Sequence, residues 1–248
     1  MLHIQRYSIV QLINPTWCFI FVIGLPLMGW AQHDHFGKNL HNYEYEKLHA
    51  GTHLGINFTT YSYRINNNLT EDDSLYHINI RGGPGFNINV PMIAWSPVYN
   101  LHFRANASIS FHETSFEYSY WKKGELKTRL YRTDLTRLNF PVQLKLNANR
   151  INNFSAYALG GFCYSYDLGS QHKAVQNDAD PIVRMKPADY AYEVGGGFDF
   201  FLEFFKFGLE LKLQQGLRDI LIHDDSFYAR PIESMKSRIW WFSFTFET

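Results

Sequence analysis

The stretch that decides the fold is Tyr99–Phe111, which reads YNLHFRANASISF. Its odd-numbered positions carry Tyr, Leu, Phe, Ala, Ala, Ile and Phe, whereas its even-numbered positions carry Asn, His, Arg, Asn, Ser and Ser. Successive side chains of a β-strand point to opposite faces, so this alternation predicts a strand with one apolar and one polar face. The stretch by itself does not say which face is the inner one.

The same period of two recurs in further segments of the chain. In 154–166 glycines interrupt the pattern, so the inward and outward positions of that segment stay unassigned. No stretch of helix length shows a convincing period of 3.6 residues. The sequence therefore predicts an all-β protein with eight strands, the other seven being 48–58, 86–92, 138–146, 154–166, 190–202, 207–213 and 240–246.

The expected connections alternate in length. Bacterial outer-membrane barrels have an even number of antiparallel strands, short periplasmic turns and longer external loops. With the N-terminus in the periplasm, every short turn falls on the periplasmic side. We therefore predict an eight-stranded antiparallel up-and-down transmembrane β-barrel. Its short connections lie near 95–98, 147–153 and 203–205, and its long ones near 59–75, 112–127, 167–188 and 218–233.

The composition favours this class of protein. Aromatic residues make up 17 % of the chain, with 21 Phe and 16 Tyr, yet the mean hydropathy is −0.28. Many aromatic residues without long apolar runs suit a sheet with one apolar face and disfavour a helical membrane protein. The 23 Lys and Arg residues equal the 23 Asp and Glu residues, so no charge excess indicates a nucleic-acid partner.

The N-terminus has the features of a secretory signal peptide, which we assign to residues 1–31. Arg6 is the only Lys or Arg there, and an apolar run follows from Trp17 to Met28. That run is short for a membrane span, although a retained anchor is the alternative. Gly29 and Ala31 supply the small residues that precede a cleavage site.

The remaining chain divides into two parts. Residues 32–46 are polar and aperiodic, and we interpret them as a periplasmic lead-in. Residues 47–248 form the predicted outer-membrane barrel domain. The expected location is thus integral in the cell outer membrane, in contact with its lipid, with the N-terminus in the periplasm.

Seven charged residues share the polar positions of their strands, and we predict that they face the lumen. Eight strands enclose a space that side chains just fill. Unpaired buried charges are costly, so these residues should pair and form a salt-bridged plug rather than a pore. This structural network, which argues against a porin, comprises Arg104, Arg137, Lys145, Glu193, Asp199, Glu210 and Lys212.

The outward positions of the fourth segment lead back to two charged residues, Asp134 and Arg132. A tilted strand crosses the membrane in about 9–11 residues, so both should lie beyond the interface, in water. Aromatic girdles mark the two interfaces of such barrels. We assign to them Trp95 and Tyr99 at one end and Phe111, Phe116 and Tyr118 at the other.

Two glycine runs, 82–85 and 195–197, could be read as phosphate loops. A phosphate loop needs a helix after it, whereas both runs lead into strand patterns. Glycines that relieve crowding in a narrow barrel explain the two runs better. The sequence thus indicates no cofactor and no small-molecule substrate.

The histidines do not form a convincing metal or catalytic site. His33 and His35 flank Asp34 in the lead-in, without a clear further ligand. His49 and His53 share a face but lie about 13 Å apart along a strand, too far for one metal. His102 also faces inward, and we expect His112 and His223 in or near loops. No Ser-His-acid set assembles by spacing, so we assign no catalytic and no metal-binding residue.

The ordered series of motifs resembles the PorT (also called SprT) proteins, outer-membrane barrels of the type IX secretion and gliding machinery of Bacteroidota. The resemblance covers nearly the whole chain after the signal peptide. His41 and Asn106-Ala107 depart from the family pattern, which often has Pro and Pro-Gly there. The matching residues are Asn39-Leu40, Tyr43, Lys47-Leu48-His49, Gly51, Leu54–Asn57, Pro84–Ile88, Phe140–Val142, Arg150–Asn153, Tyr157, Gly160-Gly161, Asp189-Tyr190, Glu193–Gly195, Gly197–Asp199, Phe205-Lys206, Glu210–Lys212, Gly216-Leu217 and Ser243–Glu247.

This resemblance implies a non-enzymatic part in exporting proteins across the outer membrane, together with other secretion-system proteins. It transfers no catalytic residue. One alternative is a structural or adhesion-type barrel whose external loops, such as 168–186, bind a partner. Another is a rim enzyme that acts on lipid or peptide.

Overall fold

The protein was analysed as a computed structural model that describes residues 37–65, 75–98, 100–122, 125–169, 184–223 and 231–248. The segment assigned to the signal peptide lies outside them. Lys38–Thr248 form one compact unit. Within the described residues, no helix is long and apolar enough to cross a membrane. The strands are β1 (Leu48–Ile65), β2 (Leu75–Gly82), β3 (Pro84–Val98), β4 (Leu101–Lys122), β5 (Glu125–Asn147), β6 (Phe154–Asp167), β7 (Ala188–Phe201), β8 (Lys206–Gly216) and β9 (Ile232–Glu247).

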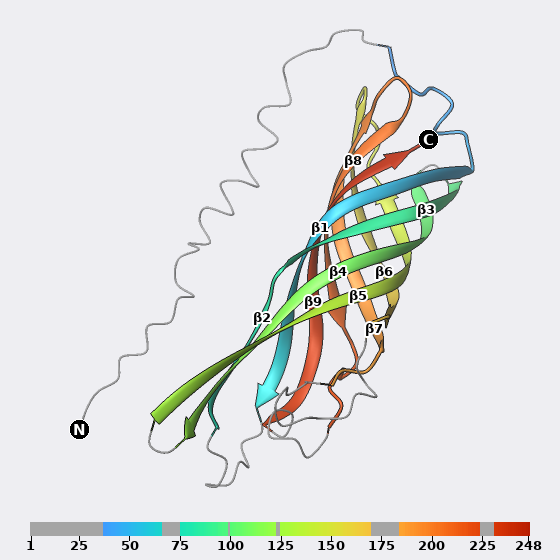
Figure 1. The fold of residues 1–248 in the computed structure, drawn as a ribbon. Helices are drawn as coiled ribbons and strands as arrows, with labels where there is room; N and C mark the ends of the chain where they lie inside the picture. The colour runs from blue at the N-terminus through green and yellow to red at the C-terminus, as the bar shows by residue number, and fades with distance from the viewer. Residues whose placement is uncertain (1–36, 66–74, 99, 123–124, 170–183, 224–230) are drawn as a thin grey trace, which may run out of the picture. The chain divides into compact units, whose positions relative to one another are not determined.

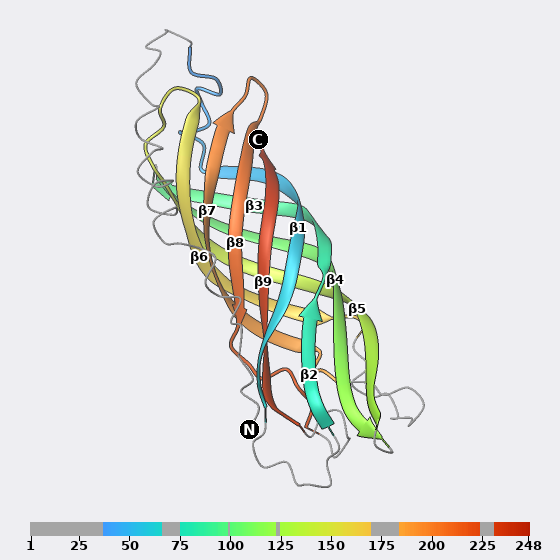
Figure 2. The ribbon, with the colours of Figure 1, turned by 90° about the vertical axis from the view of Figure 1, so that its left-hand side faces the viewer.

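Eight of these strands close a ring (Figures 1 and 2). Going around it, β1 pairs with β3, each following strand pairs with the next as far as β9, and β9 returns to β1. Every pairing is antiparallel. The predicted eight-stranded antiparallel barrel is therefore confirmed. We call the end of the ring where the described chain begins and ends the near end, and the opposite end the far end.

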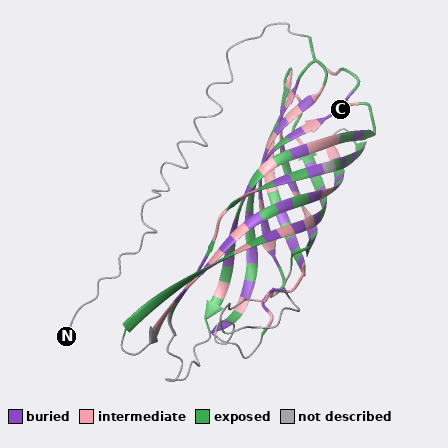
Figure 3. Ribbon diagram, viewed as in Figure 1, coloured by how far each residue is buried: buried purple, intermediate pink, exposed green. Residues whose placement is uncertain are grey.

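Buried and exposed residues alternate along the strands, which Figure 3 shows as bands. In β4, Arg104 and Ser110 are buried, whereas Phe103 and Ile109 are exposed. The polar face of the alternation is thus the inner one. The structure also shows which residues of β6 face inward, which the sequence left unassigned. They are the odd-numbered ones, Tyr157 among them.

The strand β2 was not predicted from the sequence. Both β2 and β3 pair with β4, so β2 lies along the far half of β4 and is separated from the ring strand β3 at Gly83. The interruption is tight, because a Cβ atom at Gly82 would lie 1.4 Å from the carbonyl oxygen of Thr59. The signal was present in the sequence, because apolar Tyr76, Ile78 and Ile80 alternate with polar His77, Asn79 and Arg81.

Several strands are longer at the far end than predicted, and the long connection expected at 112–127 is wrong. β4 continues to Lys122 and β5 begins at Glu125, so the two strands form a long hairpin. β5 pairs with β6 only from Arg137 onward. Residues 75–82, 112–122 and 125–136 therefore form a three-stranded sheet beyond the ring, which projects at the lower left of Figure 1. We call it the ribbon.

An apolar cluster lies between the ribbon and the far ends of β1 and β9. It corrects the girdle assignment of Phe116 and Tyr118, which are 1 % and 0 % exposed. Both occupy even-numbered positions of β4, which face inward. Beyond the ring, side chains at these positions pack against apolar residues rather than entering a charged lumen. The cluster comprises Tyr61, Ile78, Ile80, Phe116, Tyr118, Leu135, Met185, Ile220, Leu221, Ile232 and Met235.

Candidate functional site

The lumen is the candidate site, because charged side chains converge in it. The seven charged residues predicted to face it are all buried, and none is more than 6 % exposed. They project from β4, β5, β7 and β8. Since an unpaired buried charge is costly, the partners of each one decide what the lumen can do.

One ion pair crosses the lumen. The guanidinium Nη1 of Arg104 on β4 lies 2.8 Å from Oε2 of Glu210 on β8. The hydroxyl of Tyr157 donates to the same carboxylate oxygen at 3.1 Å. Because β4 and β8 are not neighbours in the ring, this pair fills the space between opposite walls.

A second pair joins neighbouring strands. Nζ of Lys212 on β8 lies 3.1 Å from Oε1 of Glu193 on β7. The side-chain amide of Gln143 donates to the other oxygen of Glu193 at 2.5 Å. Both carboxylate oxygens of Glu193 are therefore occupied.

A cluster of two lysines and two carboxylates lies toward the near end. Nζ of Lys145 lies 2.8 Å from Oδ2 of Asp199, and Nζ of Lys206 lies 3.5 Å from the same atom. Lys206 is also paired directly with Glu247, and Lys145 lies 3.8 Å from that carboxylate. The four charges cancel within one cluster.

Sequence reasoning did not include Lys206 and Glu247 in the network. The alternation predicts both residues. On β8, every second residue from Glu210 back to Lys206 faces inward, and on β9 the inward positions continue from Thr245 to Glu247. Both residues lie at strand ends, where the pattern alone does not show whether the strand continues.

The seventh predicted residue, Arg137, stands apart from these pairs. Among the described residues, no carboxylate lies within ion-pair distance of it, and its buried Nη1 has no hydrogen-bond partner. Asp167 is its direct neighbour in the β5–β6 register. The structure therefore joins six of the seven predicted residues in ion pairs and leaves Arg137 out.

Tyr43 of the lead-in enters the near end of the lumen. Its ring stacks on His49 with centroids 3.9 Å apart. Its hydroxyl accepts a hydrogen bond from Lys206 at 2.6 Å and donates one to Glu247 at 2.7 Å. Burial, followed by the nearby carboxylate of Glu247, raises the pKa of Tyr43 well above 10.0, so the phenol stays protonated and keeps this donor role.

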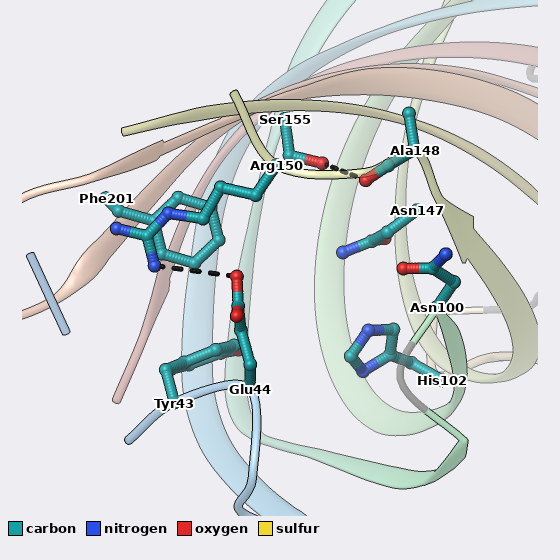
Figure 4. Close-up of a pocket in the computed structure, with 9 residues that line it drawn as sticks. All are labelled: Tyr43, Glu44, Asn100, His102, Asn147, Ala148, Arg150, Ser155 and Phe201. Atoms are coloured by element: carbon teal, nitrogen blue, oxygen red, sulfur yellow. Dashed lines mark hydrogen bonds and ion pairs between the residues drawn. The ribbon is translucent and has the colours of Figure 1, made fainter. Parts of the chain in front are cut away.

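Other contacts hold the lead-in against the turns of the near end (Figure 4). The backbone amide of Asn39 donates to Oδ1 of Asn153 at 2.9 Å, and its side chain donates to the carbonyl of Phe201 at 3.0 Å. The guanidinium of Arg150 lies 3.8 Å from the centre of the Phe201 ring and 3.8 Å from Oε1 of Glu44. The segment 39–46, expected as an aperiodic lead-in, thus covers the mouth of the barrel.

The histidines of the barrel contact amides and hydroxyls. His53 lies 2.8 Å from the side chain of Asn89, and His102 is hydrogen-bonded to Ser96. The expectation that His112 lies in or near a loop is wrong, because it is buried within β4 and lies 2.7 Å from Oγ1 of Thr59. Within the described part of the chain, no group of three or more His, Cys, Asp or Glu residues could hold a metal ion. His33–His35 lie outside that part.

Two small cavities lie in the described part of the lumen. A cavity beside His53, Glu193 and Lys212 measures about 10 Å³. Another, beneath the lead-in at Tyr43 and Arg150, measures about 20 Å³. Each holds about one water molecule.

The family described as "Outer membrane protein beta-barrel domain" matches residues 30–221 of the chain. The chain belongs to this family. A comparison with curated protein sequences gave no match. Among solved structures, the chain is similar to OprG of Pseudomonas aeruginosa, with 12 % identity over 82 % of this chain and 96 % of that one and a TM-score of 0.48. It is also similar to Ail of Yersinia pestis, with 10 % identity over 82 % of this chain and 100 % of that one and a TM-score of 0.36.

An outer-membrane barrel presents an apolar band to lipid, and the outward residues of this one form such a band. Trp95 and Phe111 are exposed on the outer wall, as the girdle assignment requires, and Tyr99 lies outside the described residues. Arg132 and Asp134 are exposed on the ribbon, beyond the last pairing of β5 with β6. Their charges therefore lie outside the apolar band.

Proposed function

We propose that this outer-membrane barrel is a non-enzymatic component of the type IX protein secretion system, needed for the export of cargo proteins. The ordered resemblance to the PorT proteins supports this role. The near end, with the lead-in, then faces the periplasm, and residues 1–31 are removed on export. Its partners are outer-membrane lipid and other secretion-system proteins.

The filled lumen is the observation that carries the proposal. Ion pairs from opposite and neighbouring walls occupy it, and Tyr43 enters its mouth. Opening a path for solute or cargo would separate buried charges, at a cost of several kcal/mol for each uncompensated one. A barrel that does not conduct acts through its surfaces, which suits a component that supports a separate translocation channel.

Deletion of the gene tests the proposed role. We expect the deletion strain to retain type IX cargo in the cell and the wild-type gene to restore its release to the medium. The protein should also co-purify with other secretion components from membranes solubilised in mild detergent. Normal cargo release in the deletion strain would overturn the proposal.

The ribbon favours a second candidate, a barrel that binds a partner at the cell surface. Leu126 and Leu130 on β5 are 49 % and 54 % exposed, although they lie beyond the ring. The edge of β5 from Glu125 to Thr136 has no strand partner besides β4 within the described residues. Such edges can accept a strand from another chain.

Shortening the hairpin distinguishes the two candidates. Replacing residues 120–127 by Asn-Gly keeps Ser119 opposite Thr128 and allows a tight turn. Loss of cell-surface binding with normal cargo release would favour the second candidate. Loss of cargo release, with the barrel still folded and inserted, would favour the first. The loop region 170–183, part of the expected binding loop, lies outside the described residues.

A further inference from the structure

The outer wall carries a groove over β6–β9 that the proposed secretion role does not explain. It measures about 750 Å³, within the range of small-ligand sites, which is about 300–1,000 Å³. Its floor is the glycine run at Gly195–Gly197, and its sides include Val194, Phe198, Leu211, Trp240 and Phe242. All five side residues are between 37 % and 54 % exposed.

The groove exists because no side chain fits at its floor. Gly196 has outward parity, between Val194 and Phe198 on β7. A Cβ atom there would lie 2.8 Å from the carbonyl oxygen of Tyr157 on the neighbouring strand. On β6 the outward residue Ala156 also lines the groove, and its small side chain makes the side of the groove low there. Backbone packing thus sets the floor of the groove, and side chains form its sides.

The position of the groove decides what can occupy it. Its sides are apolar residues of β7, β8 and β9 that belong to the outward band facing lipid. The one charged residue that lines it, Glu210, is 2 % exposed and paired with Arg104 on the inner side. The groove therefore offers no charged group for a headgroup or a charged peptide. Besides Glu210, its polar side-chain groups are the Tyr157 hydroxyl, which donates to Glu210, and the indole N–H of Trp240. Hydrocarbon chains are what surrounds the groove in the bilayer.

We propose that the groove over Gly196 binds an acyl chain of an outer-membrane phospholipid in preference to the rest of the outer wall. A flexible chain can follow the hollow between Val194 and Phe198 and contact Leu211, Trp240 and Phe242 along its length. Burial of each methylene group contributes to such binding, whereas a flat wall leaves part of the chain without contacts. This proposal does not depend on the secretion role.

A photoreactive lipid tests the site. The purified barrel is placed in phospholipid nanodiscs that contain a trace of phosphatidylethanolamine with a diazirine in its acyl chain, and labelled residues are mapped by mass spectrometry after illumination. We expect labelling to concentrate at Val194–Phe198 and Leu209–Leu213. Ala156→Phe fills the groove and should lower that labelling by about tenfold.

The matched control is Ala107→Phe. Ala107 is half-buried like Ala156. It lines a smaller groove of about 380 Å³, which also lies on the outer wall but over β3, β4 and β5. This variant should leave the labelling at β7 and β8 unchanged. If Ala156→Phe does not fold, as judged by heat-dependent gel mobility, Leu211→Trp fills the same groove from an outward position.

Two results would overturn the proposal. One is labelling spread evenly over the outer wall, or unchanged in the groove-filling variant. The other is loss of the phospholipid label on adding an equal amount of unlabelled free fatty acid, which would assign the groove to a fatty acid instead.

Discussion

At the scale of single residues, the buried charges of the lumen are tolerated because they are paired. Arg104 and Glu210 are each at most 2 % exposed and lie 2.8 Å apart. Removing one charge of a buried pair leaves the other without compensation, which costs more than the pair itself contributes. Substitutions of single charges therefore report on the network directly.

We expect Glu210→Gln to destabilise the barrel by about 3–5 kcal/mol, because the guanidinium of Arg104 then lacks its carboxylate. Urea-induced unfolding in detergent micelles, followed by heat-dependent gel mobility, measures the change. Glu117→Gln is the control, since Glu117 is half-buried and lies 3.9 Å from the exposed Arg81. Its effect should stay within about 1 kcal/mol. Equal stabilities of the two variants would contradict the pairing.

Asp219, between β8 and β9, should make the far end sensitive to acid. Burial alone would raise its pKa, but hydrogen bonds from the Met235 amide, from His223 and from the Leu221 amide outweigh burial and hold the pKa below its ordinary 3.8. A carboxyl with a lowered pKa contributes stability at neutral pH, and this contribution is lost as pH falls through the folded-state pKa.

We therefore expect hydrogen exchange at the Leu221 and Met235 amides, corrected for its intrinsic pH dependence, to accelerate as pH falls below about 4. In Asp219→Asn the acceleration should disappear, because the amide does not titrate. A wild-type protein whose protection at these two amides is constant down to pH 3 would argue against this role.

At the scale of elements, the interruption between β2 and β3 depends on the absence of a side chain. Gly82 approaches the backbone of Thr59 so closely that a Cβ atom would overlap with it. Gly160 on β6 differs, since a Cβ atom there would lie 3.7 Å from its nearest neighbour, the carbonyl oxygen of Glu193.

Gly82→Ala should therefore destabilise the barrel by about 1–3 kcal/mol, the usual cost of overpacking. Gly160→Ala should be neutral or stabilising by up to about 1 kcal/mol, because it restricts only the unfolded chain. Unfolding midpoints in urea compare the two variants. A neutral Gly82→Ala would show that β1 and β2 can separate without loss.

At the scale of the whole molecule, a lumen filled by ion pairs predicts a barrel that does not conduct. The cavities of about 10 and 20 Å³ in the lumen do not make a channel. Planar bilayers containing the purified protein should show no steady conductance of porin size. Replacing Tyr43 by Ala should add brief openings at most, because the ion pairs of the wall remain. Steady large conductance of the unaltered barrel would contradict this picture.

The sequence by itself determined the eight strands of the ring and which side chains share a face, because both follow from the period of two, a local property of the chain, as in Tyr99–Phe111. The inner face and the closure into a barrel were inferred from the composition, the signal peptide and the alternating lengths of the connections. It located Arg104 and Glu210 on inward faces but could not join them, because their strands lie on opposite sides of the ring. Only the tertiary structure decided which charges pair.

The tertiary structure also decided the features where the local pattern is weak or absent. Tyr43 lies in an aperiodic segment, and its place in the lumen depends on Lys206 and Glu247, which are remote in sequence. On the ribbon, the inward positions of β4 continue beyond the ring and enter an apolar cluster. The groove over Gly196 requires four strands in register. Each of these depends on contacts between distant segments, which a period of two does not encode.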